Sequence, residues 1–367
     1  MGECMRIIIA HQTVAVHDAI GNDIEQMYML LNRRSECYVY AENTFRKTLK
    51  YISKDQLEDF LKDDKSVLIY HHSVYWEDGQ QILKEARGKV VIRYHNVTPP
   101  EFFESYSQFH YLQCAMGRKQ TQDIARQFPE AIWLCDSAYN QEDIMEVPDD
   151  RVKICPPFNK LSEWDSIVPE EVTLKRLIES KEIQLLFVGR IAPNKGHRFL
   201  LEIIRTFRAN YRQPVKLNVI GKFDSELELY NEELRNQIAM YQLQDDVEFV
   251  GEMTDARMAA YYLGCDFFVC ASEHEGFCVP ILEAQYFGLP IIALKSCAVP
   301  DTGGEGQILL DKNEKDFAAA IHVLKNNGKY NELLRKKGFD NVEGRMAYST
   351  ICQCFQDFTE KNLELEW

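Results

Sequence analysis

Short, almost uninterrupted apolar runs recur along the chain, separated by longer stretches in which apolar residues return at roughly helical spacing. Runs of this kind are typical of strands buried on both faces of a parallel sheet. The predicted strands are 6–10, 37–40, 66–70, 89–94 and 131–135 in the first half, and 183–188, 215–220, 247–250, 265–270 and 291–294 in the second. This alternation of strands and helical stretches ends once, before the segment 159–180, and begins again after it. The sequence therefore predicts an α/β protein with two doubly wound halves.

The predicted helices fall between these strands and after the last of them. They are 24–31, 106–128, 199–207, 226–243, 258–263, 280–287, 317–325, 330–337 and 346–363. The segment from Asn159 to Ser180 is polar and acidic, and we expect the linker between the two halves there.

Composition limits the classes of function. With 367 residues, 46% hydrophobic and 27% charged, the chain is long enough for two domains with their own cores. A formal net charge of −15 disfavours a general nucleic-acid binder. The basic residues of segment 33–54 suit a solvated face, contact with an anionic membrane surface, or an acidic acceptor.

Cysteine usage and hydropathy predict a cytoplasmic protein. The 11 cysteines are odd in number and lack C-x-x-C spacing, which favours reduced thiols over disulfides or a zinc site. The apolar run 5–10 is too short for a signal peptide, and no run approaches the ~18 residues that span a bilayer. Any membrane contact is therefore expected to be peripheral.

Residues 272–290 form the most informative stretch. The polar start, Pro280 in a first helical turn and Gly288 at the end predict a loop followed by a helix. Free backbone amides at such a start suit a phosphate. Glu275 before the helix and Glu283 inside it are placed to accept hydrogen bonds from a polyhydroxylated ligand, although a solvated loop with a surface glutamate fits the same pattern.

A second polar turn follows the strand 183–188. Arg190 and Lys195 flank it, and a planar cation and a point cation so placed can hold a diphosphate. Alternatively, they are ordinary surface charges.

Polar loops also follow the first-half strands. Gly21 lies in the loop after the first strand, where it is either a diphosphate-approach glycine or a plain turn residue. His95 ends the strand 89–94, as a site residue or a satisfied loop histidine. A metal site of His71, His72 and His95 is not expected, because adjacent histidines of a strand point to opposite faces.

Four segments resemble a known family. EGFCVPILE at 275–283 resembles the E-x7-E signature of retaining GT-B glycosyltransferases, in particular of family 4, and FVGRIAPNKG at 187–196 resembles the phosphate loop of that family. HDAIGND at 17–23 resembles the first loop of some bacterial family 4 enzymes. RYHNVTPPEFF at 93–103 resembles a segment of bacterial O-antigen and exopolysaccharide transferases. Cys278 departs from the pattern, since glycine is usual there, and this affects the expected shape of the loop around the sugar.

The resemblance implies a GT-B fold, with two doubly wound Rossmann-like domains facing a central cleft. Residues 1–165 would form an acceptor-binding domain, completed by the C-terminal helix within 346–367. Residues 166–345 would form the nucleotide-sugar-binding domain.

The resemblance also implies roles for individual residues. The implied catalytic residues are His95, Arg190, Lys195 and Glu275. The implied donor-binding residues are Gly21, Arg190, Lys195, Gly221, Glu252, Met253, Glu275, Gly276, Phe277, Cys278 and Glu283. Among these, Arg190 and Lys195 would stabilise the leaving diphosphate, Glu275 would hold the sugar hydroxyls and Glu283 the ribose, while backbone near Glu252 would face the base.

The implied reaction transfers a hexose of mannose, glucose or N-acetylglucosamine type from a UDP- or GDP-sugar to a hydroxyl of a glycan or lipid-linked glycan, with retention. It would serve surface polysaccharide synthesis, at the inner face of the membrane or free in the cytoplasm, without a cofactor or divalent metal. The sequence shows no obvious carboxylate nucleophile for a double displacement. The resemblance implies attack on the face from which the diphosphate leaves, with a phosphate oxygen accepting the acceptor's proton, and under that account Glu275 is not a nucleophile. The alternatives are a UDP-sugar 2-epimerase on the same fold and a catalytically silent sugar-nucleotide-binding scaffold subunit.

Overall fold

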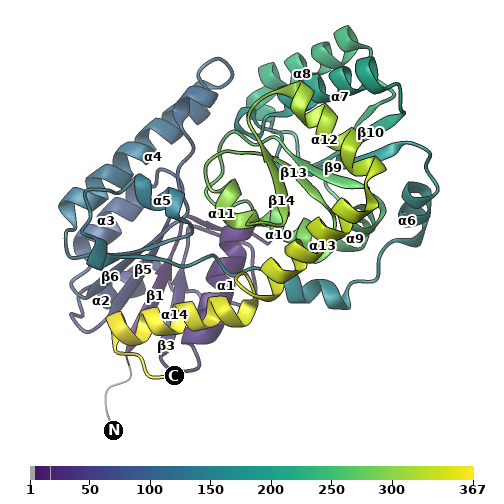
Figure 1. Cartoon of the computed structure of the whole chain (residues 1–367). Helices are drawn as coiled ribbons and strands as arrows, with labels where there is room; N and C mark the ends of the chain where they lie inside the picture. The colour runs from purple at the N-terminus through teal and green to yellow at the C-terminus, as the bar shows by residue number, and fades with distance from the viewer. Residues whose placement is uncertain (1–4, 17) are drawn as a thin grey trace. The chain divides into compact units, whose positions relative to one another are not determined.

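The computed structural model describes residues 5–16 and 18–367, which group into two compact units (Figure 1). The first unit runs to Pro99 and continues with 112–160 and 348–367. The second unit comprises 100–111 and 161–347. The domain boundary expected at 165/166 lies close to the change of unit at Lys160. The segment 100–111, which the sequence analysis places in the N-terminal domain, groups with the second unit.

The first unit is built on a parallel sheet with the strand order β3-β1-β5-β6-β7-β8. Its strands are β1 (Arg6–Ala10), β3 (Glu36–Tyr40), β5 (Val67–His72), β6 (Lys89–Tyr94), β7 (Ile132–Cys135) and β8 (Val152–Ile154), with a separate small pair, β2 (Thr13–Val14) and β4 (Asn43–Thr44). Ile9 of β1 lies opposite both Val39 and Ile69, and all three side chains are buried. The apolar runs thus form the centre of the sheet.

Helices cover this sheet, and one of them comes from the far end of the chain. They are α1 (Ala19–Leu31), α2 (Lys54–Leu61), α3 (Glu77–Glu85), α4 (Gln108–Gln127), α5 (Ala138–Glu142) and α14 (Tyr348–Leu363). The α14 side chains Ile351, Phe355 and Phe358 join the same buried cluster as Leu31 of α1 and Val39 of β3, and α14 lies along this unit in Figure 1. The C-terminal helix therefore completes the hydrophobic core of the first unit.

The second unit repeats the architecture with the strand order β11-β10-β9-β12-β13-β14. Its strands are β9 (Ile183–Val188), β10 (Val215–Ile220), β11 (Val247–Gly251), β12 (Phe267–Cys270), β13 (Ile291–Leu294) and β14 (Gln307–Leu310). Its helices are α6 (Glu171–Ile178), α7 (His197–Tyr211), α8 (Glu228–Tyr241), α9 (Asp255–Gly264), α10 (Val279–Tyr286), α11 (Val299–Gly303), α12 (Glu314–Asn326) and α13 (Gly328–Glu343). The prediction of an α/β protein with two doubly wound sheets is confirmed.

Part of the expected linker is structured. The helix α6 lies within 159–180 and packs on the second unit, where Leu177 is buried with Tyr261 and Tyr262 of α9. The helix was not predicted because the polar and acidic residues of this segment concealed one apolar helix face.

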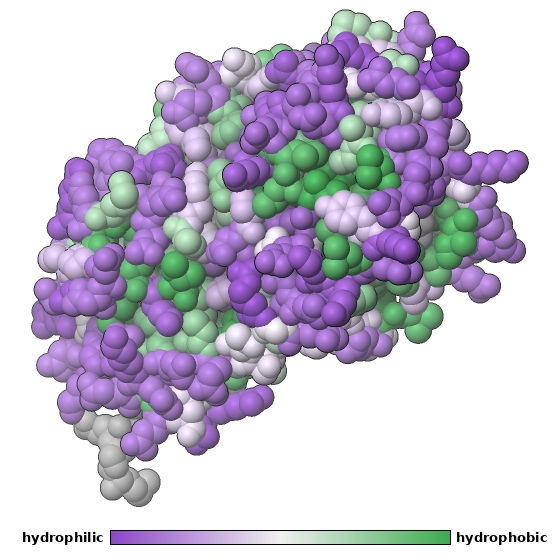
Figure 2. Space-filling model, viewed as in Figure 1, coloured by the Kyte–Doolittle hydropathy of each residue, from purple (hydrophilic) through white to green (hydrophobic). Residues whose placement is uncertain are grey.

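Surface polarity agrees with the composition. On the face shown in Figure 2, hydrophilic residues cover most of the surface, interrupted by scattered hydrophobic patches. Among residues 5–16 and 18–367, no helix combines the length and apolar content required to cross a membrane.

Candidate functional site

The strand order of the second sheet changes direction between β9 and β12, because β10 and β11 lie on one side and β13 and β14 on the other. In open parallel sheets, ligands bind beyond the carboxyl ends of the strands at such a switch point. The loops leaving β9 and β12 are tied together there. The amide of Glu273 donates to the carbonyl of Asn194 (2.8 Å), and Nδ2 of Asn194 donates to the carbonyl of His274 (3.3 Å).

Lys195 and Glu275 meet at this point. Nζ of Lys195 lies 2.7 Å from Oε1 of Glu275, and their side chains are only 21% and 12% exposed. Burial is the largest single influence and lowers the pKa of Lys195, but the Glu275 carboxylate and the nearby Cys278 together raise that pKa above its ordinary value. The structure therefore joins two residues of the sequence-predicted site that are 80 positions apart.

Gly196 makes this approach possible. It adopts φ +72°, and a Cβ at this position would lie 2.0 Å from the carbonyl oxygen of Ala271 in the β12 loop. Both the left-handed backbone and the close approach require glycine.

Arg190 does not join the Lys195–Glu275 pair. Its side chain is 51% exposed, and its Nη1 lies 4.0 Å from Oδ2 of Asp224. An exposed pair at this distance contributes little, so the guanidinium can turn towards a ligand with small loss.

A loop leads into α10, as the sequence predicted. Pro280 stands in the first turn, and Phe277, before the helix, is 6% exposed and held by the Thr302 hydroxyl, which donates to its carbonyl. Cys278 caps the helix with φ +80°, in the left-handed region that favours glycine. The cysteine therefore adopts a backbone conformation that strains a residue with a side chain. Gly276 lies two residues before it.

Glu283 lies in α10 with its carboxylate directed at α9. Tyr262 donates its hydroxyl proton to Oε2 of Glu283 at 2.7 Å. Burial is the main cause that raises the pKa of Glu283, and the Tyr262 hydrogen bond acts in the opposite direction.

The remaining predicted donor residues of this unit lie at neighbouring strand ends. Gly221 follows β10, and a Cβ there would lie 1.9 Å from the carbonyl oxygen of Gly189, so the residue permits close packing of the β9 and β10 loops. Glu252 and Met253 follow the edge strand β11, where Glu252 is exposed and Met253 packs on the core.

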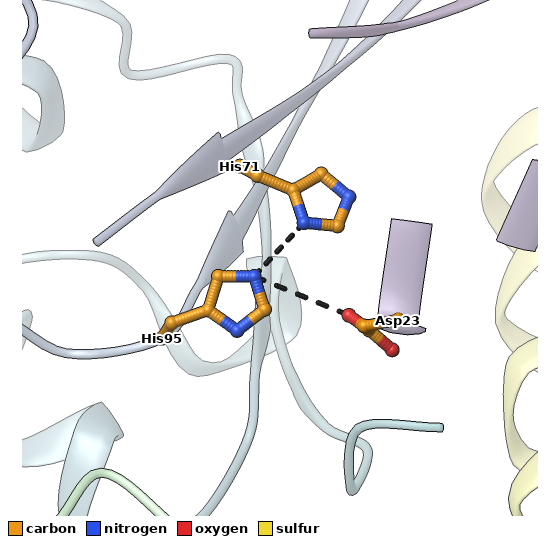
Figure 3. Close-up of side chains that lie close together, drawn as sticks. All are labelled: Asp23, His71 and His95. Carbon is orange, nitrogen blue, oxygen red and sulfur yellow. Dashed lines mark hydrogen bonds and ion pairs between the residues drawn. The ribbon is translucent and has the colours of Figure 1, made fainter. Parts of the chain in front are cut away.

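In the first unit, His95 lies at the corresponding place. The sheet changes direction between β1 and β5, and His71 of β5 and His95 after β6 meet there with Asp23 of α1 (Figure 3). Nδ1 of His71 lies 2.9 Å from Nε2 of His95. On the other side, Nδ1 of His95 lies 2.8 Å from Oδ2 of Asp136. Because a carboxylate only accepts, His95 carries its proton on Nδ1.

Asp23, His71 and His95 also resemble a metal-ligand group, with their ligand atoms within 4.8 Å of one another. The distances suit a shared proton better. The 2.9 Å between His71 and His95 is a hydrogen-bond distance, and Oδ2 of Asp23 already accepts from Nε of Arg93 at 2.8 Å. The buried Arg93 charge, which also lies 3.1 Å from Asp136, disfavours a divalent cation beside it.

Burial keeps the imidazoles of His71 and of the neighbouring His11 neutral. Burial lowers the pKa of His71 well below its ordinary value, assisted by the neighbouring His95, His11 and Arg93. Burial likewise lowers the pKa of His11 to about 4. The His71–His95 contact is therefore a chain of hydrogen bonds that ends at the Asp136 carboxylate.

Gly21 is not in the loop expected for it. The helix α1 begins at Ala19, so Gly21 lies in its first turn, and its amide donates to Oδ2 of the capping residue Asp18 at 3.0 Å. A Cβ there would lie 2.3 Å from the carbonyl oxygen of Ala15, which explains the glycine by packing. The loop prediction was wrong because Asp18 acts as an N-cap within a run that seemed too polar for a helix.

Sequence reasoning did not identify the partners of the predicted residues, which are His71, Arg93, Asp136 and Tyr262. Two of them carried a signal. Arg93 lies in an otherwise apolar strand, which indicates a buried counter-charge, and Asp136 directly follows β7 at the same sheet edge. Nothing in the sequence distinguishes Tyr262 from its neighbour Tyr261.

Comparison with known proteins first identifies a class. Residues 170–340 match the family model described as glycosyl transferases group 1. This match includes the β9 loop, the β12 loop and α10, and therefore the Lys195–Glu275 pair.

Individual relatives are more distant. The chain is 28% identical over 181 residues to the D-inositol 3-phosphate glycosyltransferase of Pseudarthrobacter chlorophenolicus, covering 48% of this chain and 42% of that protein. It is 35% identical over 141 residues to the GDP-mannose:cellobiosyl-diphosphopolyprenol alpha-mannosyltransferase of Xanthomonas campestris, covering 38% and 36%. The chain thus spans less than half the length of these relatives.

The fold extends further than the sequence similarity. The crystal structure of Anabaena Alr3699/HepE in complex with UDP matches with a TM-score of 0.76 at 15% identity, over 97% of this chain and 100% of that one. The fold is that of the GT-B glycosyltransferases.

Proposed function

We propose that this chain is a retaining glycosyltransferase. It moves a hexose of mannose, glucose or N-acetylglucosamine type from a nucleoside diphosphate sugar to a hydroxyl of a glycan or lipid-linked glycan, in surface polysaccharide synthesis. The observation that carries the proposal is the Lys195–Glu275 pair, held at the switch point of the second sheet by Gly196. The match of 170–340 to glycosyl transferases group 1 supports it.

The proposed roles follow from charge and position. Breaking the glycosidic bond places negative charge on the leaving diphosphate, which Lys195, Arg190 and the amides at the start of α10 stabilise. Glu275 accepts from donor sugar hydroxyls, and Glu283 accepts from the ribose. Since these groups supply the positive potential, we propose that no divalent metal is needed.

The proposed transfer needs no protein nucleophile. The acceptor hydroxyl oxygen bonds to the anomeric carbon on the face from which the diphosphate leaves, and a diphosphate oxygen accepts the hydroxyl proton. We propose that His95 is the catalytic residue of the first unit and that Asp136 orients its imidazole ring. The polyprenol-linked substrate in the name of the Xanthomonas campestris relative supports a lipid-linked acceptor, and hence work at the inner face of the membrane.

The test is a transfer assay with labelled UDP-glucose, UDP-N-acetylglucosamine and GDP-mannose, polyprenyl-diphosphate-linked acceptors and EDTA. We expect one donor to give a product whose anomeric configuration, read by NMR, equals that of the donor. Inverted product would contradict retention, and activity that EDTA abolishes and a divalent ion restores would contradict metal independence. Epimerised sugar nucleotide without transfer would indicate the epimerase, and binding without turnover a silent subunit.

Arg190→Ala provides the internal check. Loss of one electrostatic donor to the leaving group is expected to reduce turnover by about 10²–10³-fold, or ~3–4 kcal/mol. Arg198→Ala is the matched control, because Arg198 is 53% exposed, similar to Arg190 at 51%, and pairs with Glu233. Equal activity of both variants would contradict the role of Arg190.

A further inference from the structure

The contact between Tyr262 and Glu283 joins two helices of the second unit. Tyr262 lies near the end of α9 and is 1% exposed, and its hydroxyl reaches Oε2 of Glu283 in α10 at 2.7 Å. Burial, and next the Glu283 carboxylate, raises the pKa of Tyr262 well above its ordinary value. The hydroxyl therefore keeps its proton at neutral pH and is the donor of this hydrogen bond.

Aromatic packing fixes the position of that donor. The Tyr262 ring stacks on Phe287, with centroids 5.2 Å apart and planes 4° apart, and Trp164 contacts it edge-on at 6.3 Å. A ring held on two sides cannot swing away without losing these contacts. The hydroxyl is thus a fixed point on which the more flexible Glu283 side chain is anchored.

The second carboxylate oxygen is left for a ligand. Oε1 of Glu283 receives no hydrogen bond from residues 5–16 and 18–367. This oxygen is not one of the fully buried polar atoms that lack a partner, so it remains accessible. A carboxylate with one oxygen anchored presents the other in a defined direction, which is the geometry required to accept from a hydroxyl of a diol.

We propose that Tyr262 is a positioning residue for donor binding. It orients Glu283 so that Oε1 accepts a hydrogen bond from a ribose hydroxyl of the nucleotide. The inference rests on the proposed function, because it assigns the ligand of Glu283. It adds a residue that touches no substrate and determines the discrimination between ribonucleotides and deoxyribonucleotides.

The anchor also determines the pH range in which Glu283 works. Burial raises the pKa of Glu283, the Asp255 carboxylate on α9 raises it further, and the hydrogen bond from Tyr262 lowers it. Removing the hydroxyl removes the lowering contribution, so the pKa of Glu283 rises further. Only the ionised carboxylate presents two acceptors, so nucleotide binding by the variant should fail at a higher pH than binding by wild type.

The experiment measures dissociation constants of UDP and GDP, together with the 2′-deoxy and 3′-deoxy forms of whichever binds. The variants are Tyr262→Phe, Glu283→Gln and their combination, each measured from pH 5.5 to 8. Tyr261→Phe is the matched control, because the neighbouring Tyr261 is equally buried but bonds to Arg176 at 2.9 Å.

Wild type should prefer the ribonucleotide over one deoxy form by about tenfold or more, as expected for a hydrogen bond to a charged group. In Tyr262→Phe the preference should fall below about threefold, and binding should weaken more steeply below pH 7. The combined variant should resemble Glu283→Gln alone, because Tyr262 acts through Glu283. Tyr261→Phe should resemble wild type.

Failure of this inference and failure of the proposed function are distinguishable. If wild type binds a nucleotide and Tyr262→Phe keeps its ribose preference and pH profile, the positioning role is wrong and the function stands. If wild type binds no nucleotide, both are wrong. If Tyr262→Phe does not fold, Glu283→Asp, which withdraws the carboxylate from Tyr262 by one methylene, should lose the preference, and retention of the preference overturns the inference.

Discussion

The pairing of Lys195 with Glu275 predicts a measurable loss of stability when it is broken. Lys195→Met leaves the Glu275 carboxylate, 12% exposed, without its partner at 2.7 Å. Breaking a fully buried pair costs about 3–5 kcal/mol, and an exposed pair is worth about 0–1 kcal/mol. For this partly exposed pair we expect about 2 kcal/mol, which lowers the Tm of a unit of this size by roughly 4–8 °C.

The chain offers a matched control, an ion pair whose glutamate lies in the same loop as Glu275. Nζ of Lys312 lies 2.7 Å from Oε1 of Glu273, the same distance, but these side chains are 50% and 31% exposed. Lys312→Met should therefore cost at most about 1 kcal/mol. The assay is calorimetric unfolding of both variants without ligand. If Lys195→Met is no more destabilising than Lys312→Met, the argument from burial is refuted.

Two further measurements refine this prediction. Adding Glu275→Gln to Lys195→Met removes the uncompensated carboxylate, so the double variant should be less destabilised than the sum of the single variants. The pH dependence follows from the raised pKa of Lys195. The stabilisation is complete below the unfolded pKa of about 10.4 and is lost as pH rises through the higher folded value, so the difference from wild type should be constant from pH 7 to 9.

Substitutions at Gly196, Cys278 and Asp136 test other parts of the structure by thermal unfolding. Gly196→Ala should destabilise by about 2 kcal/mol or more, because its φ of +72° strains any side chain, whereas Gly328→Ala, with open space around the site, should be neutral or stabilising. Cys278→Val should cost about 1–3 kcal/mol at φ +80°, while Cys278→Gly should stay within about 1 kcal/mol of wild type because relief of strain offsets the lost side chain; equal effects would contradict the assigned strain. Asp136→Asn should cost about 1–3 kcal/mol, because it weakens the compensation of the fully buried Arg93 charge; an unchanged Tm would contradict that ion pair.

The strands were the most predictable part of the fold. A strand buried on both faces is largely apolar, so runs such as 183–188 and 215–220 are recognisable although they contain Gln184, Lys216 and Asn218. The strand β14 was missed because Gly303, Gly304 and Gly306 precede it and indicated a loop. The helix α3 was missed because its N-cap residue, Trp76, makes no side-chain cap hydrogen bond and because Gly79 lies inside it, although Glu77, Asp78 and Lys84 are suitably placed at its ends.

The candidate site was predictable as a set of loops and not as a set of contacts. The carboxyl ends of parallel strands share one sheet edge, so Lys195 and Glu275 were expected near each other. The contact itself depends on Gly196 allowing the β9 loop to approach Ala271, which no spacing in the sequence reveals. The charge network around His95 is likewise a property of three-dimensional packing.

The most direct test of the central claim is a thermal-shift panel of UDP, GDP, ADP and their sugars with EDTA, on wild type and Glu283→Ala. The account predicts that one nucleotide stabilises wild type, by about 2.7 kcal/mol at ~100 times its Kd, and that the variant loses most of this shift. Wild type that no nucleotide stabilises, or a Glu283→Ala variant that responds as strongly as wild type, would contradict a nucleotide-sugar site on the second unit.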